Sequence, residues 1–230
     1  MTLWLKDECP AEAILARLDA LRSKTTTTPS LASLNATTYR EGEATVIAFE
    51  AGTCLVLPPP VAAPWPLTDG FAFEPPPSFG AAMAIANGME LSYFDPGSLP
   101  ERSGEVTRKH TRFFAGAGRE AVESWRDDWL APILDEPEEY GFDDEALARH
   151  EPSDFMVVYD DANGTFGGFH RQIAGPSGEP AFVLWMHDEP GGFYGRSLAR
   201  ADTLTHGDYL VALVYAHATD SDAYDLLFRG

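Results

Sequence analysis

FMVVYDDANGTFGGFHRQIAGPSGEPAFVLWM, residues 155–186, contains three apolar runs separated by two turn-forming segments. Each run has the length of a β-strand and is rich in aromatic and β-branched residues. The segments between them, Asp160-Asp-Ala-Asn-Gly164 and Gly175-Pro-Ser-Gly178, carry the Asn, Gly and Pro residues that tight turns require. Because strands joined by such short turns run antiparallel, this stretch predicts a three-stranded meander. The predicted strands are residues 155–159, 166–173 and 181–186.

The sequence on either side of the meander predicts helices and one more strand. After it, a polar turn and a short segment lead to an apolar-periodic stretch that predicts a closing helix from about Gly207. Before it, residues 80–86 (GAAMAIA) favour a short helix that ends at Asn87-Gly88. Residues 89–94 (MELSYF) then predict a short strand.

The first seventy residues predict a helix followed by a β-hairpin. Pro10 suits a first helical position, and apolar side chains recur on one face over the next dozen residues. Residues 44–57 (ATVIAFEAGTCLVL) predict two strands that turn at Ala51-Gly52. Helices first and an antiparallel meander later indicate the α+β class. We expect residues 1–70 to be an extension packed on a main domain, residues 71–230, which carries an acidic insertion at residues 120–154.

Composition excludes several classes of protein. The 230 residues are 44% hydrophobic and 12% aromatic, which is enough to build a core and excludes global disorder. The formal net charge of −20 argues against nucleic acid and anionic membranes as partners. The chain has no apolar run long enough to cross a membrane, no signal peptide at its start, and only two cysteines, so we expect a cytoplasmic protein.

Residues 120–154 concentrate the negative charge. Thirteen Asp and Glu residues and only two Arg residues lie in this window. Such a concentration opposes compaction, but it creates a local field that attracts cationic partners. Three readings remain open at this point: a solvated acidic surface, a docking surface for a basic protein, and a weak site for divalent metal ions.

The beginning of this window predicts an amphipathic helix. In residues 119–130 (REAVESWRDDWL), Trp125 and Trp129 share a helical face, whereas Asp127 and Asp128 lie on the opposite one. We therefore expect the tryptophans in the core and the two aspartates in solvent. Two prolines, Pro132 and Pro137, are expected to break the chain and to leave residues 135–145 as an exposed acidic loop or short helix.

Catalytic and metal-binding motifs are absent from the sequence, which has no G-x-S-x-G, no glycine-rich phosphate loop and no H-E-x-x-H. Residues 160–164 lack the ligand alternation of a calcium loop. His187-Asp188-Glu189 is the best local candidate for an acid–base pair or a metal site, although its place before Pro-Gly-Gly favours a polar turn. The sequence therefore predicts no catalytic residues, no metal and no cofactor.

Three pieces of the chain occur in an order that resembles the SUKH (Smi/Knr-type) superfamily. They are an entry segment at residues 75–91 (PPPSFGAAMAIANGMEL), the strand and acidic turn at residues 155–164 (FMVVYDDANG), and a strand ending in Trp-x-His-Asp at residues 180–188 (PAFVLWMHD). The resemblance implies an α+β fold without shared catalytic residues. It also implies the role of many bacterial members, which are immunity proteins that neutralise toxins exchanged between competing cells.

The leading functional hypothesis is therefore an immunity protein that occludes the basic active-site surface of a toxin acting on nucleic acids or nucleotides. Carboxylates would steer the toxin, and two aromatic residues, Tyr140 and Phe142, would anchor it. The alternative is a non-catalytic regulatory or scaffold protein that docks a basic host protein. A third hypothesis is an enzyme that uses His187 and Asp188. The carboxylates of the predicted contact are Asp127, Asp128, Asp135, Glu136, Glu138, Glu139, Asp143, Asp144 and Glu145.

Overall fold

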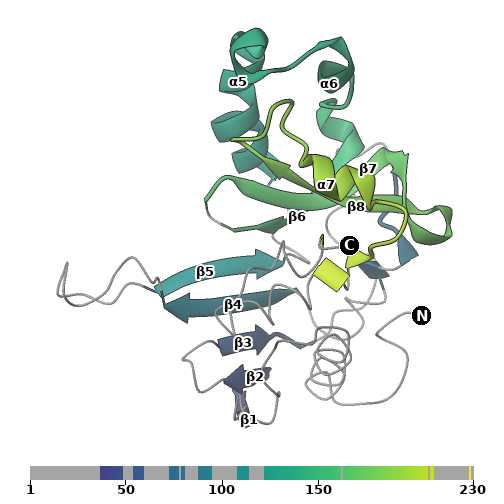
Figure 1. Cartoon of the computed structure of the whole chain (residues 1–230). Helices are drawn as coiled ribbons and strands as arrows, with labels where there is room; N and C mark the ends of the chain where they lie inside the picture. The colour runs from purple at the N-terminus through teal and green to yellow at the C-terminus, as the bar shows by residue number, and fades with distance from the viewer. Residues whose placement is uncertain are drawn as a thin grey trace. The chain divides into compact units, whose positions relative to one another are not determined.

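The computed structural model describes residues 37–48, 54–59, 73–77, 79–80, 88–94, 108–113, 122–161, 163–206, 208–209 and 228. These residues form strands and short helices, so the α+β class is confirmed (Figure 1). The chain divides into two compact units. The first unit comprises Met1–Val61, Ala81–Arg112 and Gly207–Gly230, and the second comprises Ala62–Gly80 and Phe113–His206. Each unit thus combines separated stretches of chain, whereas the sequence predicts one division at residue 70.

The first unit contains an antiparallel run of strands. Its members are β1 (Thr37–Glu41), β2 (Ala44–Ala48), β3 (Cys54–Leu57), β4 (Met89–Phe94) and all but the last residue of β5 (Arg108–Phe113). The predicted hairpin is confirmed, because β2 pairs with β3 with Val46 opposite Val56. The predicted strand at residues 89–94 is also confirmed. Since β3 pairs with β4, the sheet continues across the predicted boundary at residue 70.

The second unit contains the predicted meander. Its strands are β6 (Phe155–Asp160), β7 (Thr165–Ala174) and β8 (Pro180–Met186), each antiparallel to the next. The turn before β7 places Gly164 at φ 82°, and the turn before β8 places Gly178 at φ 76°, as their sequences predict. Nearly every side chain of β6 and β8 is buried, which explains why these strands read as continuous apolar runs rather than alternating ones.

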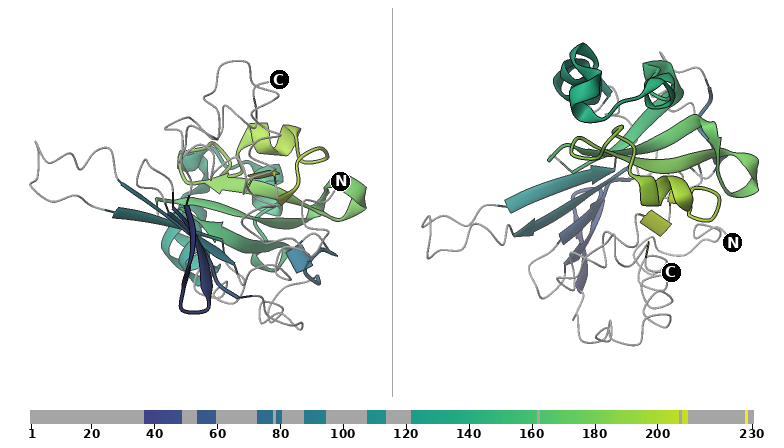
Figure 2. Two further views of the ribbon diagram at one scale, coloured as in Figure 1. Left: turned by 90° about the horizontal axis from the view of Figure 1, so that it is seen from below. Right: turned by 45° about the horizontal axis from the view of Figure 1, so that its top comes forward.

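Residues 122–154, named here the acidic segment, form a chain of short helices. They are η3 (Ser124–Leu130), α5 (Ala131–Asp135), η4 (Pro137–Tyr140), α6 (Asp144–Ala148) and η5 (Pro152–Asp154). Figure 1 and the right-hand view of Figure 2 show α5 and α6 over one face of the β6–β8 sheet.

One helix prediction in this segment is confirmed and another is wrong. The helix predicted to end at residue 130 is present from residue 122 onward, but Pro132 does not break it. The helix widens to π geometry before the proline, where the N–H of Ala131 donates to the carbonyl of Arg126, five residues earlier. Residues 122–135 are thus continuously helical, and the widened turn accommodates Pro132, which has no N–H to donate.

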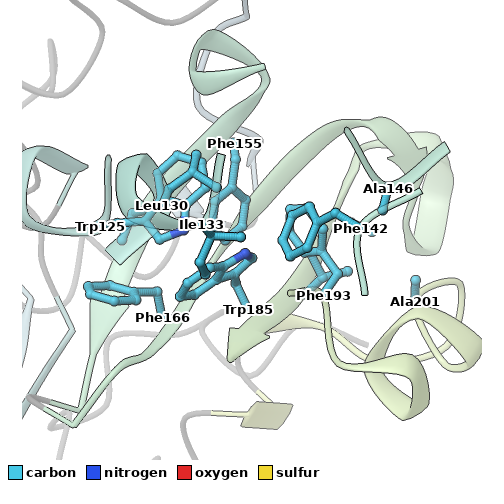
Figure 3. Close-up of a cluster of buried hydrophobic side chains, with 13 residues drawn as sticks. Trp125, Leu130, Ile133, Phe142, Ala146, Phe155, Phe166, Trp185, Phe193 and Ala201 are labelled. Atoms are coloured by element: carbon cyan, nitrogen blue, oxygen red, sulfur yellow. The ribbon is translucent and has the colours of Figure 1, made fainter. Parts of the chain in front are cut away.

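Aromatic side chains fill the space between the acidic segment and the sheet (Figure 3). Trp125 lies edge-on to Phe155 and to Trp185, with ring centroids 5.0 and 6.1 Å apart. The opposite face of the sheet is covered by Phe79 and His206, whose rings lie 5.9 and 5.6 Å from the ring of Phe169. A sheet buried on both faces is a rigid base on which the acidic segment is held.

Several predicted helices lie outside the described residues. These are the first helix, the helix at residues 80–86 apart from the described, helical Gly80, and most of the closing helix, of which only Asp208 and Tyr209 are described. The structure adds α7 (Gly195–Ala199), which the sequence does not predict. This helix follows a short segment that covers the outer edge of β8, where Tyr194 donates its N–H to Leu184 and the hydroxyl of Ser197 accepts the N–H of Leu184.

Candidate functional site

The acidic segment presents two opposite faces. Trp125, Leu130 and Ile133 point into the core, whereas Asp127 and Asp128 are exposed. The predicted separation of tryptophans from aspartates is therefore confirmed, with Trp129 partly buried against the core. All nine carboxylates of the predicted contact lie at the surface, and they are Asp127, Asp128, Asp135, Glu136, Glu138, Glu139, Asp143, Asp144 and Glu145.

Four of these nine carboxylates have partners within the segment. Asp127 accepts two hydrogen bonds from the guanidinium of Arg126, at 2.7 and 3.0 Å, and these bonds lower the pKa of Asp127. Asp128 accepts from the hydroxyl of Ser124 at 3.0 Å, and Glu145 pairs with Arg149 one helical turn later. Asp143 accepts the N–H of Ala146 at 2.8 Å and so caps the N-terminus of α6. Local structure accounts for these four.

The other five carboxylates make no hydrogen bond or ion pair with any residue that the structure describes. They carry a charge of −5 on η4 and its neighbours, and nothing in the described chain neutralises it. Such charges repel one another, although Glu138, Glu139 and Asp144 lie in the first turns of η4 and α6, where a negative charge is favourable. Their field is directed into solvent, where it can act on an approaching molecule. The five residues are Asp135, Glu136, Glu138, Glu139 and Asp144.

Two exposed apolar side chains lie among these carboxylates. Leu134 is 40% exposed and Tyr140 is 43% exposed. Among the described residues, Tyr39 in the first unit is the only other large apolar side chain with comparable exposure. An aromatic or aliphatic side chain inside a charged rim is the arrangement found at the centres of protein interfaces. The exposure of Tyr140 is compatible with its predicted role as an anchor. Leu134, which the sequence does not single out, is a second candidate for that role.

The predicted anchor role of Phe142 is wrong. Its side chain is only 5% exposed and packs against the ring of His150, with ring centroids 4.6 Å apart. The reason is the turn at Gly141, whose φ of 73° reverses the chain between the exposed Tyr140 and the buried Phe142. Phe142 is a core residue and no partner can reach it without unfolding the segment.

The turn after β8 adds two more acids to this surface. The N–H of Gly191 donates to the carbonyl of Tyr140 at 3.3 Å, and Pro190 packs closely against Gly141. Asp188 and Glu189 precede these contacts and therefore adjoin the acidic segment. The sequence singles out Asp188 only as an acid–base or metal-site candidate, because it contains no signal that this turn folds against residues 140–141.

The ring of His187 packs against an aromatic neighbour. Its exposed ring lies 4.7 Å from the ring of Trp129 and makes no hydrogen bond to Asp188.

Within the described ranges, no group of three His, Cys, Asp or Glu side chains is placed to hold a metal ion. Nor does any helix in these ranges have the length and apolar character needed to cross a membrane.

Two buried histidines join the end of α6 to the sheet. His150 lies with Nδ1 2.6 Å from the carbonyl oxygen of Ala146 and with Nε2 2.9 Å from Nε1 of Trp185. His170 lies with Nε2 2.9 Å from the carbonyl oxygen of Arg149. Burial lowers the pKa of His150 to about 4 and also lowers that of His170. Two neutral, hydrogen-bonded imidazoles therefore connect the end of α6 in the acidic segment to the sheet.

Comparisons with family models, with curated proteins and with solved structures found no match to this chain.

Proposed function

We propose that this chain is a non-catalytic binding protein that docks a basic protein surface, and that its partner is a toxin which it neutralises. The observation that carries the proposal is the set of five carboxylates without a described partner, which lie in the same stretch of chain as the exposed Leu134 and Tyr140. Mutual repulsion of such clustered charges opposes folding, whereas an interface uses both the charges and the exposed apolar side chains.

The two kinds of side chain would have different tasks in such a complex. The carboxylates accelerate association by attracting a basic surface over several ångströms, and they disfavour acidic partners. Tyr140 and Leu134 then lose their contact with water, which slows dissociation. An active site that binds nucleic acids or nucleotides is basic because it must hold phosphates. A carboxylate-rich surface with an apolar centre is suited to covering such a site.

The assignment to toxin immunity rests on the sequence, through the order of segments that resembles the SUKH superfamily. The alternative partner is a basic host protein, which the same surface would dock in a regulatory or scaffold complex. Both functions place the protein in the cytoplasm and require no cofactor. The two functions differ in the effect of the free partner: an unbound toxin harms the cell, whereas an unbound host protein does not.

The deciding experiment is co-purification of the tagged full chain from a lysate of its own cells, in low and in high salt, followed by expression of the bound chain alone. A basic chain that stops growth alone, but not when co-expressed with this protein, supports immunity. A bound basic chain without effect on growth supports the scaffold alternative instead. Recovery of an acidic partner, or of none at either salt concentration, contradicts the docking of a basic surface.

Matched variants then locate the interface. Tyr140→Ala should weaken the complex about tenfold or more, as removal of an interface anchor does. Tyr39→Ala is the control, because Tyr39 is similarly exposed, at 48%, but lies in the first unit. Equal affinity of the two variants would exclude Tyr140 as an anchor.

A second pair of variants separates local charge from net charge. Glu138→Gln with Glu139→Gln should slow association several-fold and reduce its dependence on salt. Glu41→Gln with Glu43→Gln changes the net charge equally at exposed positions of the first unit. The same slowing in both pairs would show that net charge, rather than the acidic segment, attracts the partner.

A further inference from the structure

Two histidines fasten the end of α6 to strands of the sheet. His150 follows α6 and reaches Trp185 in β8, whereas His170 lies in β7 and reaches back to the carbonyl of Arg149. The remaining ring nitrogens are also engaged: Nδ1 of His150 with the carbonyl of Ala146, and Nδ1 of His170 with the N–H of Gln172 at 3.2 Å. All four ring nitrogens therefore have hydrogen-bond partners.

These partners fix the protonation state of both rings. An indole N–H and a backbone N–H can only donate, so Nε2 of His150 and Nδ1 of His170 must be unprotonated acceptors. Carbonyl oxygens can only accept, so the other nitrogen of each ring carries the hydrogen. Both imidazoles are therefore neutral and they are opposite tautomers. A second proton on either ring would point one N–H at another.

The surroundings of His150 offer a positive charge no compensation. Its ring lies between those of Phe142 and Phe193, with centroids 4.6 and 4.7 Å away. A Cβ on Gly192 would collide with the atoms of the hydrogen bond between His150 and Trp185, so backbone covers that bond closely. The charged or titratable groups that face His150 are His170 and Arg149, and both disfavour its protonation.

His170 has a mixed electrostatic environment. Burial is the largest influence on its pKa and lowers it, and Arg149 acts in the same direction. The hydrogen bond to the carbonyl of Arg149 and the carboxylate of Asp154 oppose this effect. Asp154 is itself held by Arg171 at 3.2 Å and by Gln172 at 2.5 Å, so part of its charge is already neutralised. Protonation of His170 is therefore also unfavourable in the folded arrangement.

We propose that His150 and His170 form an acid-sensitive clamp, which holds η4 and α6 on the β6–β8 sheet at neutral pH and releases them when the rings take up protons. A released imidazole returns to its ordinary pKa near 6.5. Each ring then favours release by about tenfold per pH unit as the pH falls below that value. This property of the chain does not depend on the proposed partner. If the partner binds the acidic segment, acid also loosens its docking surface.

The tautomers provide the first test. A long-range ¹H–¹⁵N spectrum of the full chain at pH 7 distinguishes the two neutral forms of histidine. We expect a hydrogen on Nδ1 of His150 and on Nε2 of His170. A protonated ring, or the same tautomer at both positions, would overturn the clamp.

Release is measured by amide hydrogen exchange between pH 7 and pH 4.5, corrected for the intrinsic dependence of exchange on pH. Because both rings take up a proton on release, peptides from residues 137–150 should lose protection about a hundredfold per pH unit below pH 6.5 while β6 remains protected. Unchanged protection of residues 137–150, or simultaneous loss in β6, would contradict local release. Glutamine at both clamp positions, His150→Gln with His170→Gln, should flatten the response, and His187→Gln, at an exposed histidine, should leave it unchanged.

Trp185→Phe provides an independent variant if the double glutamine substitution does not fold. It removes the indole N–H that favours the neutral form of His150 while keeping an aromatic ring at that position. The midpoint of acid release should therefore move to higher pH. An unchanged midpoint would show that the hydrogen bond to Trp185 does not control the clamp.

Discussion

The inner face of the acidic segment is packed against the sheet, whereas its outer face is exposed to solvent. The inner face is packed: Trp125 is fully buried between Phe155 and Trp185. The outer face carries Glu138 and Glu139, whose exposed side chains make no hydrogen bond or ion pair with any residue that the structure describes. Packing stabilises the segment, and the proposed function assigns recognition to its outward charges. Substitutions on the two faces should therefore separate folding from binding.

The largest effect on this comparison is expected from Trp125→Ala. The substitution removes a fully buried indole from the centre of the aromatic cluster and leaves a cavity. We expect the free energy of unfolding to fall by about 4 kcal/mol, measured by urea denaturation. A loss below about 1 kcal/mol would show that the inner face does not carry the stability of the second unit.

Phe142→Ala and Tyr140→Ala test the comparison at two positions only two residues apart. Phe142→Ala should lower the free energy of unfolding by about 3 kcal/mol, because it empties a core position between η4 and α6. Tyr140→Ala should change it by less than about 0.5 kcal/mol, because its side chain is largely in solvent. Thermal unfolding of both variants measures the contrast. Similar losses of unfolding free energy in the two variants would show that the two faces do not differ in their contribution to stability.

Acid should destabilise the second unit through His206, which lies on the face of the sheet opposite the acidic segment. The pKa of His206, on the far face of the sheet, is lowered to about 4 by burial. The unfolded chain takes up a proton near pH 6.5 and the folded chain does not, so stability is full above pH 6.5 and falls as the pH decreases toward 4. Between pH 6.5 and pH 5 this histidine should remove about 2 kcal/mol, measured by urea denaturation across pH.

A variant isolates that contribution. His206→Phe keeps an aromatic ring among Phe79, Phe169 and Phe182 but cannot titrate. The difference in stability between this variant and the parent chain should grow as the pH falls. A constant difference from pH 7 to pH 5 would mean that His206 is not the group that takes up the proton.

The meander and the two faces of the helix could be predicted from sequence because local patterns encode them. Apolar runs separated by Asn-Gly and Gly-Pro turns specify β6, β7 and β8 almost residue by residue. Strands β1 (TTYRE) and β5 (RKHTRF) escape prediction because they are polar and acquire their structure from neighbouring strands.

The candidate site could be predicted only in part, because long-range contacts complete it. Composition locates the carboxylates, but no local signal separates the buried Phe142 from the exposed Tyr140. The same limit applies to histidines: His150 is buried and His187 exposed because of strands and turns far away in the sequence. The pairing of Gly191 with Tyr140 likewise joins residues about fifty positions apart and has no counterpart in the local pattern.

Asp143 gives the finest test of the comparison, because it belongs to both faces. Its carboxylate is exposed with the other acids, yet it accepts the N–H of Ala146 and begins α6. Asp143→Asn removes the charge and keeps a capping side chain, whereas Asp143→Ala removes both. We expect the alanine variant to lose about 1 kcal/mol of stability and the asparagine variant almost none, measured by thermal unfolding.

The association rates of the same two variants with a basic partner should show whether Asp143 acts through its charge or through its cap. If Asp143 contributes through its charge, both variants slow association with a basic partner equally, although only one is less stable. If it contributes only by holding α6 in place, Asp143→Asn binds like the parent chain and Asp143→Ala alone is impaired. The first result would make Asp143 part of the recognition surface. The second would restrict recognition to the five carboxylates without described partners and would place Asp143 with the packed inner face that supports them.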